Sequence, residues 1–167
     1  FQKKTTKYFS NLINNAMPDS YNYFLLNEPF SSLYPVRVLN YFKDAKLIIV
    51  HRDPRDSYCN LISETSDFMP KEVDQYINLY KHMVTVSRRN EKDDHRVLRI
   101  NFEDLILKYD DTIKTVFDFL NIDESNHINK FKYFDPNVSI KNIGIWKKHN
   151  NQDEMNRIYR ELKEYCR

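Results

Sequence analysis

The sequence is poor in glycine, because its 167 residues contain only Gly144. An average usage of roughly 7% would give about 12 glycines in a chain of this length. A P-loop needs several glycines, since its backbone must approach the phosphates closely. These residues therefore lack a glycine-rich phosphate loop.

Cysteines and long apolar runs are also scarce. The two cysteines, Cys59 and Cys166, cannot form a disulfide framework, and neither has other metal-binding residues at a useful spacing. We therefore predict two ordinary thiols and no metal site. No run of about 18 apolar residues occurs, and no basic segment followed by an apolar one opens the chain, so these residues show neither a membrane span nor a signal peptide.

The chain has no large excess of charge of either sign. It carries 26 basic and 24 acidic residues, which gives a net charge of +2, so a general affinity for nucleic acid or anionic membranes is not expected. Hydrophobic residues make up 41% of the sequence, enough for one sizeable core, and we predict a single domain over residues 1–167. Because the sequence opens on Phe1, we expect this domain to be incomplete at its N-terminus.

Apolar periodicity predicts alternating strands and helices. The expected strands are residues 21–27, 45–51 and 96–102. The second contains the continuous apolar run "LIIV", as in a strand covered on both faces. The expected helices are residues 3–15, 33–42, 70–89, 111–120 and 153–166. Residues 122–150 are expected to be irregular. The order strand, helix, strand predicts an α/β fold with a three-layer parallel sheet flanked by helices.

The segment "AKLIIVHRDPRD", residues 45–56, joins a predicted buried strand to a charged turn. Asp53 suits the N-cap of a following helix, Pro54 its first position and Asp56 its third. The helix amides and the guanidinium of Arg52 would together form an anion site at the carboxyl end of the strand. The alternative is that Asp53 only caps the helix while Arg52 and Arg55 are solvated.

Four segments, in this order, resemble the PAPS-dependent sulfotransferase superfamily, and in particular its tyrosylprotein and bacterial tetratricopeptide-linked branches. They are "NEPFSSLYPVRVLNYFKDAKLI", "LIIVHRDPRDSYCN", "RINFEDLILKYDDTIKTVFDFLNI" and "NIGIWKKH". The resemblance implies a P-loop NTPase-like sulfotransferase fold, PAPS as the sulfuryl donor and PAP as the product. It also implies an acceptor hydroxyl on a carbohydrate or a protein.

The resemblance assigns five residues to the nucleotide. Arg52 and Asn60 would hold the 3′-phosphate together with amides at the start of the helix, and Gly144 would approach it with its backbone. Trp146 would steady the loop or pack on the nucleotide, and Lys147 would add positive charge.

The resemblance also suggests Glu28, at the end of the predicted strand 21–27, as the base for the acceptor hydroxyl, because other sulfotransferase branches place a glutamate or histidine near this strand end. His51 is interpreted as a packed or hydrogen-bonded histidine. Three residues depart from the family pattern: Asn60 stands at a serine position, Asn27 at a lysine position of the branches named above, and Phe102 at a tyrosine position.

These departures, with the missing glycine-rich loop, leave two alternatives open. One is a non-catalytic sulfotransferase-like binding module, and the other is a P-loop kinase-like phosphotransferase. Nothing in the sequence names the acceptor, although residues 64–72 and 122–141 are expected to form the loops that select it.

Overall fold

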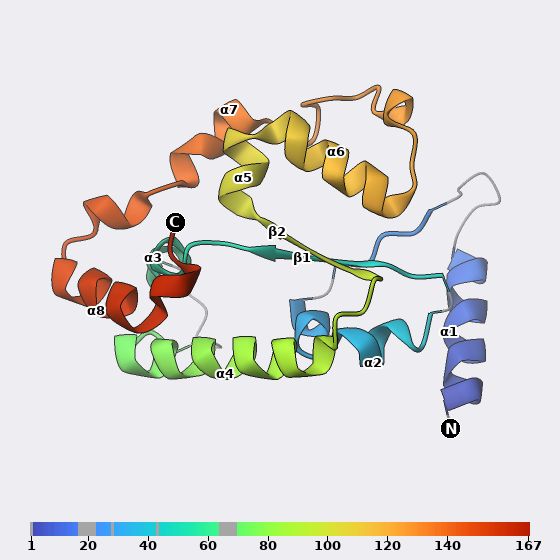
Figure 1. Cartoon of the computed structure of the whole chain (residues 1–167), viewed down its shortest axis with the longest axis horizontal. Coiled ribbons are helices and arrows are strands. Elements are labelled where there is room, and N and C mark those ends of the chain that lie inside the picture. Colours follow the sequence, from blue (N-terminus) through green and yellow to red (C-terminus); the bar gives the residue numbers. More distant parts are fainter. Residues whose placement is uncertain (1, 17–22, 28, 43, 64–69) are drawn as a thin grey trace. The chain divides into compact units, whose positions relative to one another are not determined.

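The computed structural model describes residues 2–16, 23–27, 29–42, 44–63 and 70–167 (Figure 1). The chain divides into two compact units. The first comprises Phe1–Leu47 with Met83–Val97, and the second comprises Ile48–His82 with Leu98–Arg167. The single domain expected from the sequence stays a prediction.

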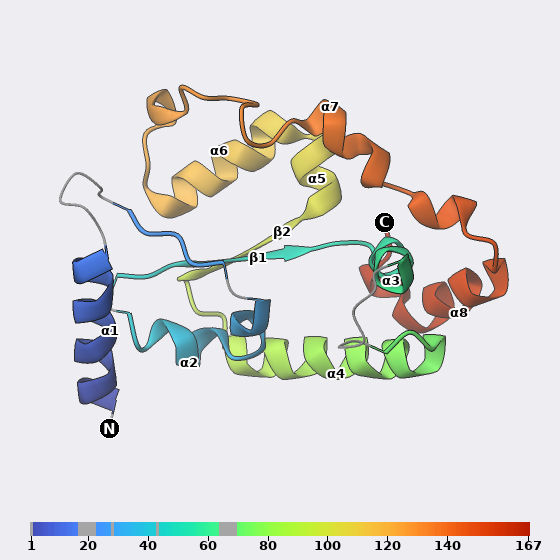
Figure 2. The same cartoon turned by 180° about the vertical axis from the view of Figure 1, so that it is seen from behind.

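The sheet of the described residues has two parallel strands, β1 (Leu47–His51) and β2 (Val97–Asn101). They lie side by side in both views (Figures 1 and 2). The aliphatic run "LIIV" and the largely aliphatic segment "VLRI" predicted the two strands, and both predictions are confirmed. The mixture of helices with a parallel sheet agrees with an α/β fold, but the described residues show two strands and not a three-layer sheet.

The strand predicted at residues 21–27 is wrong over its described part, because residues 23–27 adopt no regular structure. Their side chains are exposed, by 68% for Tyr23 and 87% for Leu25. A strand requires a neighbour that exchanges backbone hydrogen bonds with it, and among the described residues only β1 and β2 pair in this way. Aromatic and aliphatic content alone was therefore not sufficient to predict a strand at these residues.

The helices of the second unit follow the strands closely. α3 (Pro54–Ser63) begins where β1 ends, and α5 (Phe102–Leu107) begins directly after β2. The remaining helices that belong wholly or partly to this unit are α4 (Val73–Glu91), α6 (Tyr109–Leu120), α7 (Pro136–Ser139) and α8 (Gln152–Leu162). Short 3₁₀ turns lie at Glu124–Asn126, Ile140–Asn142, Ile145–Lys148 and Lys163–Tyr165. α5 was not predicted, because its first residue, Phe102, falls in the predicted strand 96–102.

The core of the second unit forms between α3, α8 and the first half of α4. Tyr58, Ile77, Met155, Ile158 and Leu162 are almost completely buried there. The apolar positions of α8 recur every three or four residues, so they share one helix face and pack together. The predicted stripe of α8 is confirmed at three positions, whereas its fourth member is 41% exposed: Tyr159.

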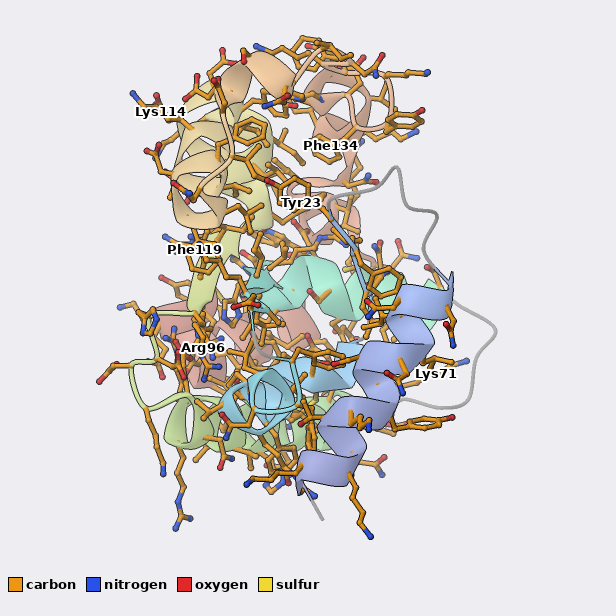
Figure 3. All side chains as sticks on the ribbon, turned by 90° about the vertical axis from the view of Figure 1, so that its right-hand side faces the viewer. Tyr23, Lys71, Arg96, Lys114, Phe119 and Phe134 are labelled. Atoms are coloured by element: carbon orange, nitrogen blue, oxygen red, sulfur yellow. The ribbon has the colours of Figure 1, made fainter. Side chains whose placement is uncertain are left out.

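Helices α5, α6 and α7 lie together in both views (Figures 1 and 2). Tyr109, at the start of α6, contacts the rings of Phe131 and Phe134 at centroid distances of 5.1 and 6.2 Å. The other face of α6 is solvated, and Lys114 extends outward from it in Figure 3. The helix ends at Asn121, whose φ of 60° is the left-handed conformation usual at helix ends.

The first unit contains α1 (Gln2–Ala16), a 3₁₀ turn at Pro29–Leu33 and α2 (Pro35–Leu39). The second half of α4 is attached to the 3₁₀ turn, because the Ser87 hydroxyl donates to the carbonyl of Ser32. α2 is shorter than the predicted helix 33–42. Pro35 fixes its first turn, since proline is accepted at the first helical position but not further inside.

Candidate functional site

The site begins at the RDPRD turn, residues 52–56, between β1 and α3. Asp53, 2% exposed, is the N-cap, since its Oδ1 accepts a hydrogen bond from the amide of Arg55 at 2.8 Å. The guanidinium of Arg55 donates to both carboxylate oxygens of Asp53, from Nε at 3.0 Å and from Nη2 at 2.6 Å. Arg55 itself is 6% exposed, so the alternative that it is solvated is wrong.

Burial by itself would lower the pKa of Arg55. The hydrogen bond and the negative charge of Asp53 outweigh this effect, so the pKa of Arg55 lies above its ordinary value. The guanidinium therefore stays charged inside the protein and neutralises the Asp53 carboxylate.

Glu103 reaches the same turn from the first residues of α5. Its Oε1 accepts a hydrogen bond from the amide of Asp53 at 2.8 Å, and Glu103 is 6% exposed. Two amides at the start of α3 are thus occupied by carboxylates, that of Asp53 by Glu103 and that of Arg55 by Asp53. The start of α3 consequently offers a phosphate fewer free amides than the sequence predicts.

Three side chains of the RDPRD turn contact the GIW loop, defined here as residues 142–148. Arg52 Nη2 donates to the carbonyl of Asn142 at 2.6 Å. The carboxylate of Asp56, 1% exposed, accepts from the amide of Gly144 at 2.7 Å and from that of Trp146 at 3.0 Å. The guanidinium carbon of Arg55 lies 3.9 Å from the ring centroid of Trp146. The structure thus joins two segments that are about 90 residues apart in the sequence.

Gly144 permits the backbone conformation of the GIW loop. Its φ is 70°, in the left-handed region that glycine adopts without steric cost. A Cβ placed on Gly144 would meet only the flexible side chain of Lys147, at 3.6 Å or more. The backbone conformation, and not a lack of space, is therefore what requires glycine here.

The other predicted nucleotide ligands lie on the same elements. Asn60 is half-buried on α3, and Lys147 is exposed in the GIW loop. Trp146 is half-buried and packs against the core of α3 and α8, while Arg55 covers its ring. These contacts attach the GIW loop to that core, and the predicted role of Trp146 in nucleotide binding stays a prediction.

The sequence predicted roles for two further residues, Glu28 and His51. Glu28 lies outside the described residues. His51 Nε2 is 2.7 Å from Arg99 Nη1, which must be the donor, so the interpretation of His51 as a hydrogen-bonded histidine is confirmed.

Sequence reasoning missed Glu103 and the loop-binding role of Asp56. The segment "NFEDL" includes Glu103, but its partner lies 50 residues earlier, and no local spacing rule links them. Asp56 at the third helical position predicted a local role at the helix start.

Both cysteines are poor nucleophiles in this environment. Burial raises the pKa of Cys59 to about 11 and that of Cys166 to about 11. Within the described ranges no group of three or more His, Cys, Asp or Glu side chains is arranged to hold a metal ion. In the same ranges no helix is long and apolar enough to cross a membrane.

The sequence model of the sulfotransferase family matches residues 2–126. The match covers more than half of the chain and includes both strands and the RDPRD turn, so the chain belongs to the sulfotransferase family. It ends before the GIW loop, which the structure nevertheless places against the RDPRD turn. Searches of curated proteins and of solved structures found no match.

Proposed function

We propose that the chain, residues 1–167, is a sulfotransferase domain that moves a sulfuryl group from PAPS to a hydroxyl of a carbohydrate or protein acceptor and releases PAP. Membership of the sulfotransferase family supports sulfotransfer as the general activity. The donor, the acceptor class and a three-layer, P-loop NTPase-like sheet are parts of this proposal.

One observation carries the proposal: the RDPRD turn and the GIW loop meet through the carboxylate of Asp56. Residues from two distant segments can bind one phosphate only if the fold brings the segments together. The proposed ligands Arg52 and Lys147 belong to these two segments. The proposal requires these two segments to meet. A chance resemblance of short motifs would not bring them together.

The residues present fit the 3′-phosphate of PAPS through their side chains. Arg52 uses Nη2 for the carbonyl of Asn142, but its Nε is buried without a hydrogen-bond partner. A buried donor without a partner costs about 1–3 kcal/mol, so the protein alone does not satisfy this guanidinium. An anion held by the guanidinium of Arg52, the side-chain amide of Asn60 and the ammonium of Lys147 would receive charge-assisted hydrogen bonds.

The start of α3 is a less suitable part of the phosphate site than these side chains. Carboxylates occupy the amides of Asp53 and Arg55, so the helix start contributes less than in a simple helix N-terminal anion site. The amides of Gly144 and Trp146 are likewise occupied, by Asp56. We therefore assign the 3′-phosphate to side chains, and not to the amides of α3 or to those two amides of the GIW loop.

PAPS, when bound, supplies a sulfuryl group that an acceptor hydroxyl can attack in line, by analogy with phosphoryl transfer. The tasks of this chain are to orient the nucleotide and to accept the hydroxyl proton. We propose Glu28 as the base. Asn27 cannot supply the positive charge of a lysine, so other cations must stabilise the transferring group.

The proposal is tested by calorimetric titration with PAP, with ADP as the comparison nucleotide. We expect PAP to bind at least about tenfold more tightly than ADP, and Arg52→Ala to lose this difference. The control is Arg160→Ala, which removes the same charge from an exposed position of α8. If PAP does not bind, or binds equally to the Arg52→Ala variant, the assignment of the 3′-phosphate is wrong.

Transfer itself is tested with PAPS and a panel of hydroxyl acceptors, comparing wild type with Glu28→Gln. We expect PAP release that depends on both the acceptor and Glu28. PAP binding without any transfer would favour the non-catalytic binding module. Turnover of ATP in place of PAPS would favour the phosphotransferase.

A further inference from the structure

The protein's own side chains attach the GIW loop to the RDPRD turn. Asp56 accepts hydrogen bonds from two loop amides, Gly144 at 2.7 Å and Trp146 at 3.0 Å. Its carboxylate is almost completely buried. A buried carboxylate that accepts two amide hydrogen bonds holds a loop far more firmly than an exposed one would, because water competes less for it.

The other two contacts between these segments have different properties. Arg55 covers the Trp146 ring, and such a cation–π contact adds stability without fixing the backbone of the loop. Arg52 holds the carbonyl of Asn142 with one nitrogen only, and its guanidinium is the group assigned to the phosphate. Asp56 is therefore the residue whose contacts order the loop backbone independently of the nucleotide.

We propose that Asp56 is a positioning residue that orders the GIW loop before the nucleotide binds. This inference rests on the proposed function, because it concerns the same 3′-phosphate site. Asp56 touches neither the phosphate nor the reacting atoms; it acts through the backbone of Gly144 and Trp146. When only a fraction of the molecules has the loop in place, the apparent Kd rises by the inverse of that fraction.

The sign of the effect separates positioning from simple electrostatics. Asp56 is an anion next to a proposed phosphate site, so its charge alone opposes the binding of an anionic nucleotide. If charge were its only influence, Asp56→Asn would bind PAP more tightly. If Asp56 orders the loop, the same substitution weakens PAP binding, and we expect about tenfold or more.

The test compares wild type, Asp56→Asn and the control Asp153→Asn by calorimetry with PAP. Asp153 lies in the exposed first turn of α8, so its substitution removes the same charge without touching the GIW loop. We expect weaker binding only for Asp56→Asn. Equal or tighter binding by Asp56→Asn, beside normal binding by wild type, would overturn the positioning role and leave the proposed function standing.

Trp146, the single tryptophan of the chain, reports on the loop directly. In ligand-free Asp56→Asn we expect red-shifted emission and stronger acrylamide quenching than in wild type. Saturating PAP should restore the wild-type spectrum. Identical spectra of the two ligand-free proteins would contradict the inference.

Amide hydrogen exchange of the wild type needs no substitution and covers the possibility that Asp56→Asn does not fold. The amides of Gly144 and Trp146 should be protected without nucleotide. Exchange at the rates of an open loop would overturn the inference. If both amides are protected but wild type does not bind PAP, the proposed function is wrong, and the positioning role is lost with it.

Discussion

Replacing Arg55 by methionine should destabilise the second unit severely. The substitution keeps an unbranched apolar side chain about as long as the methylene part of arginine, but it removes the guanidinium that neutralises Asp53. The Asp53 carboxylate, 2% exposed, would keep only two backbone donors, the amides of Arg55 and Arg167. Removing one partner of a buried ion pair typically costs about 3–5 kcal/mol. The two remaining amides place our expectation at the lower end, about 3 kcal/mol.

Arg157→Met is the matched control. Arg157 Nη2 lies 2.7 Å from Asp74 Oδ1, but these side chains are 51% and 55% exposed. Such a surface pair contributes about 0–1 kcal/mol, because solvent screens the charges and ordering the side chains costs entropy. Two ion pairs with nearly the same bond length should thus differ severalfold in their effect on stability.

The assay is urea denaturation followed by circular dichroism and by the fluorescence of Trp146. The cycle Asp53→Asn, Arg55→Met and the double variant isolates the coupling between the two residues. We expect a coupling energy of about 2 kcal/mol, because the double variant leaves no uncompensated charge. A loss below about 1 kcal/mol for Arg55→Met, equal to the Arg157→Met control, would refute the reasoning that burial determines the strength of this pair.

Three further predictions follow from the described contacts. Since burial raises the pKa of Cys59 to about 11 and of Cys166 to about 11, native protein at pH 8 should react with iodoacetamide about a hundredfold more slowly than urea-unfolded protein; equal rates would show that the thiols are not shielded. Hydrogen bonds from the side chain and backbone of Arg96 lower the pKa of Asp94 to about 2. This stabilisation should be complete above about pH 4 and lost as the pH falls through about 2. Because the pair is near the surface, we expect unfolding curves of Asp94→Asn and wild type to differ in free energy of unfolding by under about 1 kcal/mol. A difference that persists below about pH 2 would contradict the prediction. Tyr58→Phe removes the hydrogen bond to the carbonyl of Lys71 at 2.7 Å and should cost about 0.5–1.5 kcal/mol in thermal or urea unfolding, whereas no loss would mean that water replaces the hydroxyl.

Local sequence predicted the elements that have strong local signals. The aliphatic runs of β1 and β2, Pro54 at the first position of α3 and the apolar stripe of α8 all express preferences of nearby residues, and the structure has these elements where they were expected. Residues 23–27 have comparable apolar content but no pairing strand among the described residues. Strand formation depends on a partner, which a local pattern does not reveal.

In the candidate site too, local sequence predicted some contacts and only the tertiary structure determined others. The sequence by itself determined Asp53 as the cap of α3, because the cap and its amide are two residues apart. Only the tertiary structure decided that Asp56 binds the GIW loop, that Glu103 occupies the amide of Asp53 and that Arg55 is buried over Trp146. These contacts join residues that are 50 to 91 positions apart. Local preferences act over a few residues, whereas the packing of α3, α5 and the GIW loop selects which distant carboxylates and amides meet.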